Sequence, residues 1–308
     1  MGQAERARER TAAAVAAARA VVARCAVLPS DPGSGTLGSL RAEVLHDSNT
    51  VTVLVHPAGV VARTVPLPPD PEATVARLQA EIDLALSLAA AGAPMALPDP
   101  RTPPRVQVEG SWAVTLWEHV PGPTAEHADP AVVAEALSRL HAAMRDAALR
   151  APRYTDRVAE ARTLLADPAR SPALPPAERM LLREALDGAE RRVLARGAAE
   201  QLLHGEPHPG NLVLGPDGPR VIDLETCCRG PVEFDLAHAP PEVVAHCRGA
   251  DRELEADCRT LVLAIAASWR FDPEDRFPDG RAWAAERIAE LRARLSDLPA
   301  GTSHPARP

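Results

Sequence analysis

The chain has 308 residues, of which 46% are hydrophobic and 25% are charged, and its formal net charge is −8. This length is sufficient for two lobes that each bury a core, and the composition is that of a globular protein. An acidic chain without a clustered basic stripe is poorly suited to the phosphate backbone of nucleic acid, so we expect no nucleic-acid partner.

All 34 basic residues are arginines, so a site that would otherwise use lysine must use arginine here. The longest apolar run near the C-terminus, residues 261–269, is shorter than the ~20 residues that cross a bilayer, and the alanine-rich N-terminus lacks the apolar core of a secretory signal. The five cysteines are an odd number, which favours reduced thiols over a disulfide framework. We therefore expect a cytoplasmic protein with no membrane partner.

The N-terminal part of the chain predicts one helix and then a linker. Residues 1–25 alternate charge with alanine, which is typical of a helix, and residues 29–39 are rich in glycine. A G-x-G-x-x-G pattern at Gly33, Gly35 and Gly38 has neither a strand before it nor a helix after it, so a flexible lead-in is favoured over a dinucleotide site.

Residues 41–47, 50–55 and 59–65 are β-rich runs separated by turn residues, which predicts an antiparallel meander. A helix over residues 69–92 should follow, with Asp70 as its N-cap, Pro71 at its first position and Gly92 at its end. One face of this helix is apolar and carries Val75, Leu78, Ile82 and Leu86. A further strand is expected at residues 111–120, ended by Pro121.

Helices dominate the rest of the chain. They are predicted at residues 129–150, 175–197, about 250–268 and 281–296. The first has Asp129 as its cap and an apolar stripe of Val133, Leu137, Leu140 and Met144. A small sheet with one helix, a connecting strand and a larger helical part indicates an α+β architecture.

The segment LLHGEPHPGNLVLG, residues 202–215, places two histidines, a glutamate and an asparagine in one loop. Pro207 and Pro209 exclude the helix that an H-E-x-x-H zinc site requires. His204-Gly205-Glu206 matches the H-x-E of zinc deaminases, but no P-C-x-x-C follows, since Cys227 and Cys228 are adjacent. A zinc hydrolase remains an alternative, although the sequence lacks some of the ligands that these zinc motifs require.

A short hairpin centred on Asp217 should follow the loop. The expected register pairs Val213 with Val221 and Leu212 with Ile222, which sets Asn211 opposite Asp223. Oxygen ligands of this kind suit Mg²⁺, which keeps several waters and often completes its shell with phosphate oxygens. With Glu206 nearby, the pattern favours phosphoryl transfer, in which a base orients the attacking hydroxyl.

The loop and hairpin carry a family resemblance. HGEPHPGN followed by VIDLE resembles the signature H-G-D-x-H-x-x-N…I-D of the aminoglycoside phosphotransferase and choline kinase-like family, a branch of the protein-kinase fold. Residues 46–65 resemble the family's first hairpin and third strand, and residues 81–94 its regulatory helix. The interlobe hinge and the segment after the metal-binding aspartate have counterparts at residues 114–122 and 230–237, so the resemblance covers roughly residues 40–240.

The resemblance implies a bilobal α+β fold with a small antiparallel-sheet N-lobe and a larger, mainly helical C-lobe. It divides the chain into an N-terminal helix and linker (1–39), a nucleotide-binding N-lobe and hinge (40–120), and a helical lobe with the catalytic loop and substrate site (121–300). By the resemblance, Ser48 and Asn49 lie in the turn over the nucleotide phosphates. Arg63 stands in place of a phosphate-binding lysine, with Glu81 as its partner. Glu118 and Val120 offer backbone contacts to the purine. The family's Mg²⁺ ligands correspond to Asn211 and Asp223, and Glu206 stands where the family has its catalytic aspartate, with His208 near substrate or metal-bound water.

By this resemblance the chain is expected to be an ATP- or GTP-dependent phosphotransferase that uses Mg²⁺. Its partner would be a small molecule with a hydroxyl group, such as an aminoglycoside-like antibiotic or another natural product, and antibiotic resistance is one possible role. The alternative is a nucleotide-binding pseudokinase, because Glu206 and Arg63 depart from the family pattern. We also expect His204 to lock the loop by hydrogen bonds, Asp235 to anchor a loop or cap a helix, and Glu225 to line the cleft or assist metal binding.

Overall fold

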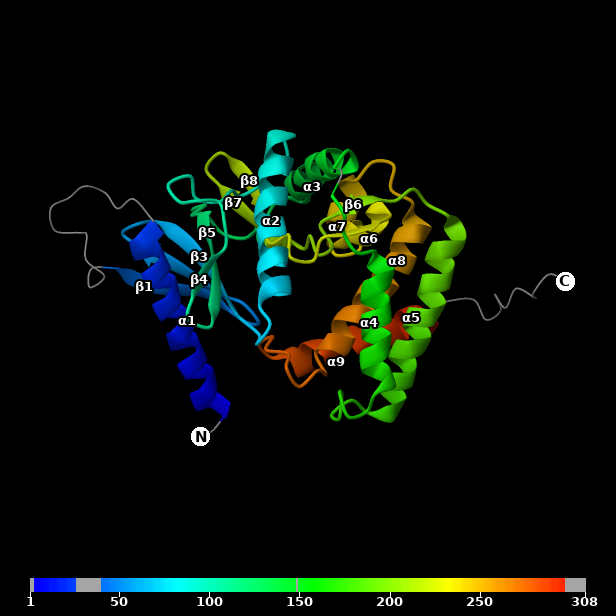
Figure 1. Cartoon of the computed structure of the whole chain (residues 1–308). Helices are drawn as coiled ribbons and strands as arrows, with labels where there is room; N and C mark the ends of the chain where they lie inside the picture. Colours follow the sequence, from blue (N-terminus) through cyan, green and yellow to red (C-terminus); the bar gives the residue numbers. More distant parts are fainter. Residues whose placement is uncertain (1–2, 26–39, 148, 297–308) are drawn as a thin grey trace. The chain divides into compact units, whose positions relative to one another are not determined.

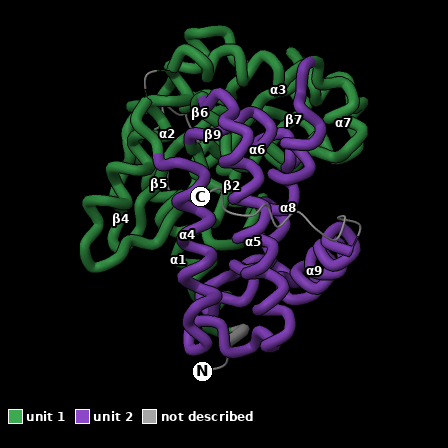
Figure 2. The backbone as a smooth tube through the Cα atoms, turned by 90° about the vertical axis from the view of Figure 1, so that its right-hand side faces the viewer, with its two compact units in different colours: residues 1–151, 201–228, 239–248 green, residues 152–200, 229–238, 249–308 purple. Residues whose placement is uncertain are grey.

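The computed structural model describes residues 3–25, 40–147 and 149–296 (Figure 1). The chain divides into two compact units (Figure 2). Unit 1 comprises Met1–Ala151, Gln201–Cys228 and Ala239–Arg248, and unit 2 comprises Pro152–Glu200, Arg229–His238 and Gly249–Pro308. The predicted linker with Gly33, Gly35 and Gly38 lies outside the described residues.

Unit 1 contains a five-stranded antiparallel sheet in the order β1-β2-β3-β5-β4. Its strands are β1 (Arg41–Asp47), β2 (Val51–His56), β3 (Val60–Pro66), β4 (Gln107–Glu109) and β5 (Trp112–Glu118). The predicted meander and the later strand are therefore confirmed within two residues at each end. The three-residue β4 was not predicted, because so short a segment carries no clear alternation.

One face of the sheet is covered by α1 (Gln3–Cys25), which confirms the predicted N-terminal helix (Figure 1). The alternation of each strand directs every second side chain toward this helix, for example Val51, Val53 and Val55 of β2. The helix contributes small buried residues at helical spacing: Ala14, Ala17, Ala18, Val21 and Val22. This packing forms the core on one side of the sheet, and the opposite face carries Arg63 together with buried residues such as Leu54 and Trp117.

The helix α2 (Glu72–Ala90) begins and ends close to the predicted positions. The N-cap is Pro71 and not the predicted Asp70, so Pro71 lies just before the first helical residue, and its carbonyl accepts a hydrogen bond from Val75. The Asp70 carboxylate lies 3.5 Å from the amide of Glu72, and Gly92 adopts a φ of 89° just past the end.

The predicted apolar face of α2 is wrong at Leu86, which is 40% exposed. At about 100° per residue, Leu86 lies about 80° around the helix axis from Leu78 and about 140° from Glu81, on the side away from most of the buried residues. The buried face instead centres on Leu78, Glu81 and Ala85, and so includes a carboxylate.

Unit 1 also contains the secondary structure around the loop of residues 202–215. Its further elements are η2 (Ala125–His127), α3 (Pro130–Arg145), β6 (Gln201–Leu203), η3 (Pro209–Asn211), β7 (Leu212–Gly215), β8 (Gly218–Val221) and α7 (Pro241–His246). Asp129 caps α3 by accepting from the amide of Ala131 at 2.9 Å, as predicted. The predicted stripe of α3 is buried, and the helix packs against β6 and β8, the strands on either side of the loop.

The hairpin of β7 and β8 has a different register from the predicted one. Leu212 pairs with Val221, and Gly215 pairs with Gly218. The turn contains only two residues, Pro216 and Asp217, and Gly218 supplies the positive φ of 102° that the tight connection needs. The shorter turn shifts the pairing by one residue, so the register places Asn211 against Ile222, whose amide donates to the Asn211 carbonyl at 3.0 Å.

Unit 2 is helical in its described residues. It contains α4 (Tyr154–Ala166), α5 (Pro176–Arg196), α6 (Val232–Leu236), α8 (Arg252–Trp269) and α9 (Gly280–Ser296), while β9 (Cys228–Gly230) lies where the chain passes from unit 1 to unit 2. The sequence predicted α5, α8 and α9 but missed α4 and the short α6. The α+β fold class is confirmed, and no helix in the described ranges is both long and apolar enough to cross a membrane.

We expect Leu137→Ala to lower the free energy of unfolding by about 2–5 kcal/mol, because Leu137 is fully buried in the core beneath the loop strands. Val132, on the exposed side of the same helix, is the matched control, and Val132→Ala should change it by less than about 0.5 kcal/mol. Urea titration followed by circular dichroism measures both. Equal losses for the two variants would contradict this packing.

Candidate active site

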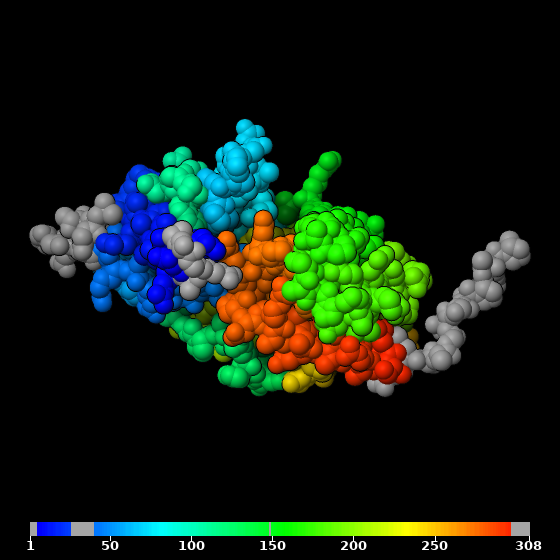
Figure 3. Space-filling model, turned by 90° about the horizontal axis from the view of Figure 1, so that it is seen from below, coloured from blue at the N-terminus to red at the C-terminus, as the bar shows by residue number. Residues whose placement is uncertain are grey.

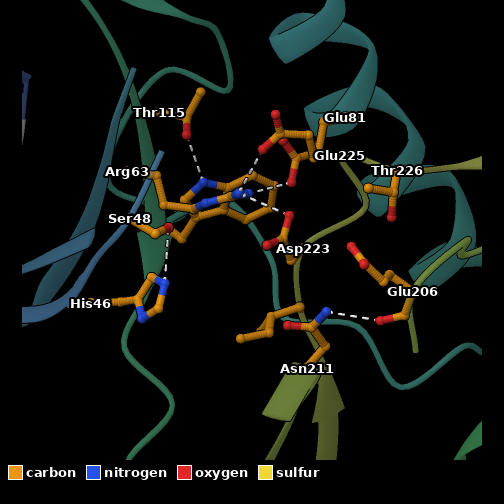
Figure 4. Close-up of polar contacts among 12 residues, drawn as sticks. His46, Ser48, Arg63, Glu81, Thr115, Glu206, Asn211, Asp223, Glu225 and Thr226 are labelled. Carbon is orange, nitrogen blue, oxygen red and sulfur yellow. Dashed lines mark hydrogen bonds and ion pairs between the residues drawn. The ribbon is translucent and has the colours of Figure 1, made fainter. Parts of the chain in front are cut away.

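Arg63 is the centre of a cluster of charges on the face of the sheet opposite α1. Its neighbour in β3, Ala62, packs toward α1, so the alternation of the strand directs Arg63 the other way. Arg63 forms an ion pair with Glu81 of α2, and its Nη2 lies 2.9 Å from Asp223 Oδ1 and 3.5 Å from Glu225 Oε2 (Figure 4). The Arg63 side chain is only 13% exposed and that of Glu81 only 3%.

This burial decides the charge state of the cluster. Burial raises the pKa of Glu81, because a carboxylate loses its hydration there, and the nearby guanidinium opposes that rise. Burial acts in the same direction on Asp223, but attraction to Arg63 outweighs it and lowers the pKa of Asp223. Burial works against the charge of Arg63, yet the surrounding carboxylates raise its pKa. The carboxyl group of Asp223 is therefore ionised, and its side chain is 40% exposed.

A second arginine of α2 belongs to the same cluster, and the sequence analysis missed it. Arg77 Nη1 lies 2.7 Å from Glu225 Oε1. Arg77 precedes Glu81 by four residues, so the two lie on the same side of the helix, and this spacing is the signal that could have identified it. Glu225 is thus shared between Arg63 and Arg77.

The backbone of Asp223 is unusual. Its φ of 64° lies in the left-handed region, which non-glycine residues seldom adopt and aspartate tolerates better than most. β8 ends at Val221, two residues earlier, where the amide and carbonyl of Val221 hydrogen-bond with Pro94 and Ala96. The strand is therefore anchored on both sides just before the chain turns to present this carboxylate.

His204 fixes the loop that carries Glu206, as the sequence predicted. It is fully buried, its Nε2 lies 2.9 Å from the carbonyl of Ile222, and its Nδ1 lies 3.3 Å from the amide of Glu206. Since a carbonyl only accepts and an amide only donates, these partners select the tautomer with the proton on Nε2. The imidazole therefore joins the loop to the chain just after β8.

The backbone of Glu206 is held on both sides. Its carbonyl accepts from the amide of His208 at 2.9 Å. It also accepts from Asn211 Nδ2 at 2.9 Å (Figure 4). Gly205 adopts a φ of 90°, and a Cβ there would lie 2.0 Å from the carbonyl oxygen of Thr226. The loop consequently has little freedom to move.

The same contacts orient Asn211 and His208. Because the amide nitrogen of Asn211 donates to Glu206, its Oδ1 is the atom left to contact a cation. His208 is exposed, and its Nδ1 accepts from the amide of Gly210 at 3.1 Å. Only Nε2 of His208 could therefore contact substrate or metal-bound water.

The remaining predicted nucleotide positions lie at two other places in unit 1. Ser48 and Asn49 form the β1–β2 turn, where the Ser48 hydroxyl lies 3.0 Å from His46 Nε2. Glu118 ends β5, and its amide donates to the carbonyl of Leu97 at 2.9 Å, so only its carbonyl is left for a purine contact. Val120 follows two residues later. The segment after it runs along β7, where the amide of Leu214 donates to the carbonyl of Pro123.

The oxygens of Asp223 and Asn211 fit a magnesium site better than a site made of many protein ligands. Within the described ranges no group of three or more His, Cys, Asp or Glu side chains has metal-holding geometry. Magnesium needs fewer protein ligands, since it binds through one or two carboxylates together with waters and phosphate oxygens. Cys227 Sγ contacts the carbonyl of Leu203 at 2.8 Å and Cys228 is buried, consistent with packing roles.

Comparison with known protein families identifies this chain. A family profile described as "Phosphotransferase enzyme family" matches residues 43–257, which is more than two thirds of the chain. The chain belongs to this family. It is therefore a phosphotransferase, and the matched region contains the whole charge cluster and the loop of Glu206. No curated protein matches the chain.

Solved structures share its fold at low sequence identity. A choline/ethanolamine kinase family protein from Mesorhizobium loti is 17% identical, with a TM-score of 0.62 over 92% of this chain and 94% of that one. The amicoumacin kinase hAmiN, in complex with AMP-PNP, Ca²⁺ and Ami, is 12% identical, with a TM-score of 0.61 over 89% and 92%. A thermostable mutant of the aminoglycoside phosphotransferase APH(4)-Ia is 13% identical, with a TM-score of 0.62 over 85% and 98%. The phosphotransferase thus has a protein-kinase-like fold.

We expect Gly205→Ala to lower turnover on the order of 10²-fold, because the new Cβ must push the loop of Glu206 away from Thr226. Gly92→Ala is the matched control, since Gly92 has nearly the same φ, 89°, but open space around its Cβ position. That variant should incur only the left-handed strain of about 1–2 kcal/mol and keep its activity. Unfolding and initial-rate measurements on both variants separate the strain of the left-handed backbone from the displacement of the Glu206 loop. Unchanged turnover in Gly205→Ala would contradict the role given to the close contact with Thr226.

Proposed function

We propose that this phosphotransferase transfers the γ-phosphoryl group of ATP or GTP to a hydroxyl group of a small molecule. The proposal rests on Arg63, which forms ion pairs with both Glu81 and Asp223. Beside it lies the loop in which Asn211 Nδ2 donates a hydrogen bond to the carbonyl of Glu206. Phosphoryl transfer depends chiefly on positioning and on neutralising charge, and this arrangement supplies groups for both.

Arg63 would bind the phosphates of the donor, as arginine grips phosphate oxygens through several N–H groups. Ser48 and Asn49 would contact the phosphates from the β1–β2 turn, and the backbone of Glu118 and Val120 would contact the purine. Mg²⁺ would be held by Asp223 and by Asn211 Oδ1, and when bound it neutralises charge on the phosphates. The related structure that contains AMP-PNP and Ca²⁺ supports a nucleotide with a divalent cation.

Glu206 would accept the proton of the acceptor hydroxyl as that oxygen attacks the phosphorus, and His208 Nε2 would help to hold the acceptor. A general base must lie within hydrogen-bonding reach of the proton it removes, so a tightly held loop favours this role. The contacts of Glu206 with His208 and Asn211 provide that rigidity.

The acceptor would be an aminoglycoside-like antibiotic or another natural product with a hydroxyl group. The related proteins include a choline/ethanolamine kinase family member and an aminoglycoside phosphotransferase, which supports a small hydroxylated acceptor. Transfer to an antibiotic would give a resistance function, and dependence on ATP or GTP favours action in the cytoplasm.

We expect Mg·ATP to raise the melting temperature of the wild-type protein and a hydroxylated acceptor to drive its consumption. Asp223→Ala should lose the nucleotide-dependent rise, and Glu206→Gln should keep it but lose turnover by at least about 10²-fold. Thermal shift with ATP and with GTP, run beside nucleotide consumption over antibiotics and amino alcohols, measures both. Nucleotide binding without turnover for any acceptor would favour the pseudokinase alternative, and no nucleotide binding would overturn the proposal.

We also expect Glu206→Asp to lower kcat by about 10- to 10²-fold, although it restores the residue type of the family signature. The fixed loop backbone cannot advance to compensate for the missing methylene, and a misplacement of about 1 Å has this effect. The KM for nucleotide should not change, because Glu206 does not contact the donor in this proposal. A kcat equal to that of the wild type would contradict this expectation. It would show that the loop moves to place the shorter carboxylate within reach of the acceptor hydroxyl.

A further inference from the structure

The first helix is joined to the β1–β2 turn by charged contacts. Arg10 of α1 forms an ion pair with Oδ1 of Asp47, the last residue of β1, and its Nη2 donates to the carbonyl of Ser48 at 2.6 Å. The hydroxyl of Thr11 donates to Oδ2 of the same aspartate. Both carboxylate oxygens of Asp47 are therefore engaged by α1.

These contacts are continuous with the buried face of α1. Arg10 precedes Ala14 by four residues and Ala17 by seven, so it lies on the face that packs against the sheet. Its side chain is only 14% exposed, and Nη1 is buried without a hydrogen-bond partner among the described residues. A buried guanidinium with one carboxylate partner is held firmly in place, because leaving that partner would leave the charge uncompensated.

The turn lies at an edge of the sheet. β1 is an edge strand of the sheet, and its side chains are mostly exposed. Its pairing with β2 is interrupted between Val44 and His46, just before the turn. Within the turn, the amide of Ser48 donates to the carbonyl of Thr50 at 3.1 Å, which shapes the turn but does not attach it to the core. The contacts from α1 provide that attachment (Figure 3 shows α1, in dark blue, against the lighter blue strands).

We propose that Arg10 and Thr11 are positioning residues that hold the β1–β2 turn in place for the phosphates of the nucleotide. This proposal rests on the proposed role of Ser48 and Asn49 as phosphate contacts. In this proposal α1 contributes to nucleotide binding without contacting the nucleotide. It lies on the face of the sheet opposite Arg63 and acts through its contacts with Asp47 and with the carbonyl of Ser48.

The variant Arg10→Met should raise the KM for nucleotide about tenfold or more, since it removes charge-assisted hydrogen bonds that fix the turn. The kcat at saturating nucleotide should stay within about twofold of the wild type, because a bound nucleotide restores the turn by its own contacts. Arg10→Lys should recover part of the lost affinity, and Asp47→Asn should mimic Arg10→Met. The double variant should be less impaired than the product of the two single effects, because both remove the same interaction.

Arg24 provides the matched control at the other end of the same helix. Its Nη1 lies 2.7 Å from Glu109 Oε2 in β4, away from the turn, so Arg24→Met removes an ion pair of α1 without touching Asp47. Its nucleotide KM should stay within about twofold of the wild type. Should Arg10→Met fail to fold, Thr11→Val removes one contact to Asp47 at almost constant volume and should raise the KM by a smaller factor.

The experiment compares nucleotide affinity, initial-rate kinetics and the melting temperature without nucleotide for the full chain and these variants. A selective rise in KM for Arg10→Met and Thr11→Val supports the proposal. A loss of melting temperature with unchanged KM, or equal KM changes for Arg10→Met and Arg24→Met, would overturn it and leave the proposed function intact. A wild-type protein that binds no nucleotide would overturn both, so the two failures are distinguishable.

Discussion

The buried carboxylate of Glu81 imposes the constraint on which the candidate site of this phosphotransferase depends. A carboxylate with 3% exposure is costly without a cation, and Arg63 provides that cation. The same guanidinium is then near enough to hold Asp223 and Glu225. The side chain of Arg63 therefore joins three elements that are distant in the sequence: β3, α2 and the segment that follows β8. The left-handed backbone of Asp223 persists within this network because β8 is anchored just before it.

Arginine suits this junction for a geometric reason. Its Nη1 pairs with Glu81 while its Nη2 contacts Asp223 and Glu225, so one planar group serves three carboxylates. A lysine ammonium is a single point charge and could not contact them in the same way. Arg77 balances Glu225 from the other side, which limits how far that carboxylate is drawn toward Arg63. Arg63 of β3 and Arg77 of α2 thus share Glu225, and both arginines belong to one electrostatic arrangement.

The sequence predicted the features that depend on local physics. Strand alternation, the proline and glycine boundaries of the helices and the loop of His204 all follow from residues near one another in the chain. The hairpin register was missed because it depends on whether the turn holds two or three residues, and both fit the same letters. The exposure of Leu86 and the role of Arg77 depend on which side of α2 meets β3 and the segment after β8. That choice is made by tertiary contacts with Arg63 and Glu225, which no local pattern contains.

The side chain of Glu206 is one methylene longer than that of an aspartate, and this length has a consequence for the acceptor. The backbone at Glu206 is held by His204 on its amide side and by His208 and Asn211 on its carbonyl side. Gly205 is pressed against the carbonyl of Thr226, so the loop cannot retreat to offset an added methylene. The carboxylate must then extend farther from the loop than an aspartate would, by about 1 Å. If Glu206 is the base, as proposed, the acceptor hydroxyl has to be held correspondingly farther from the loop while still facing the phosphates at Arg63. Under this proposal, the acceptor pocket, and not the loop of Glu206, is where the shape of the site has to accommodate the longer side chain.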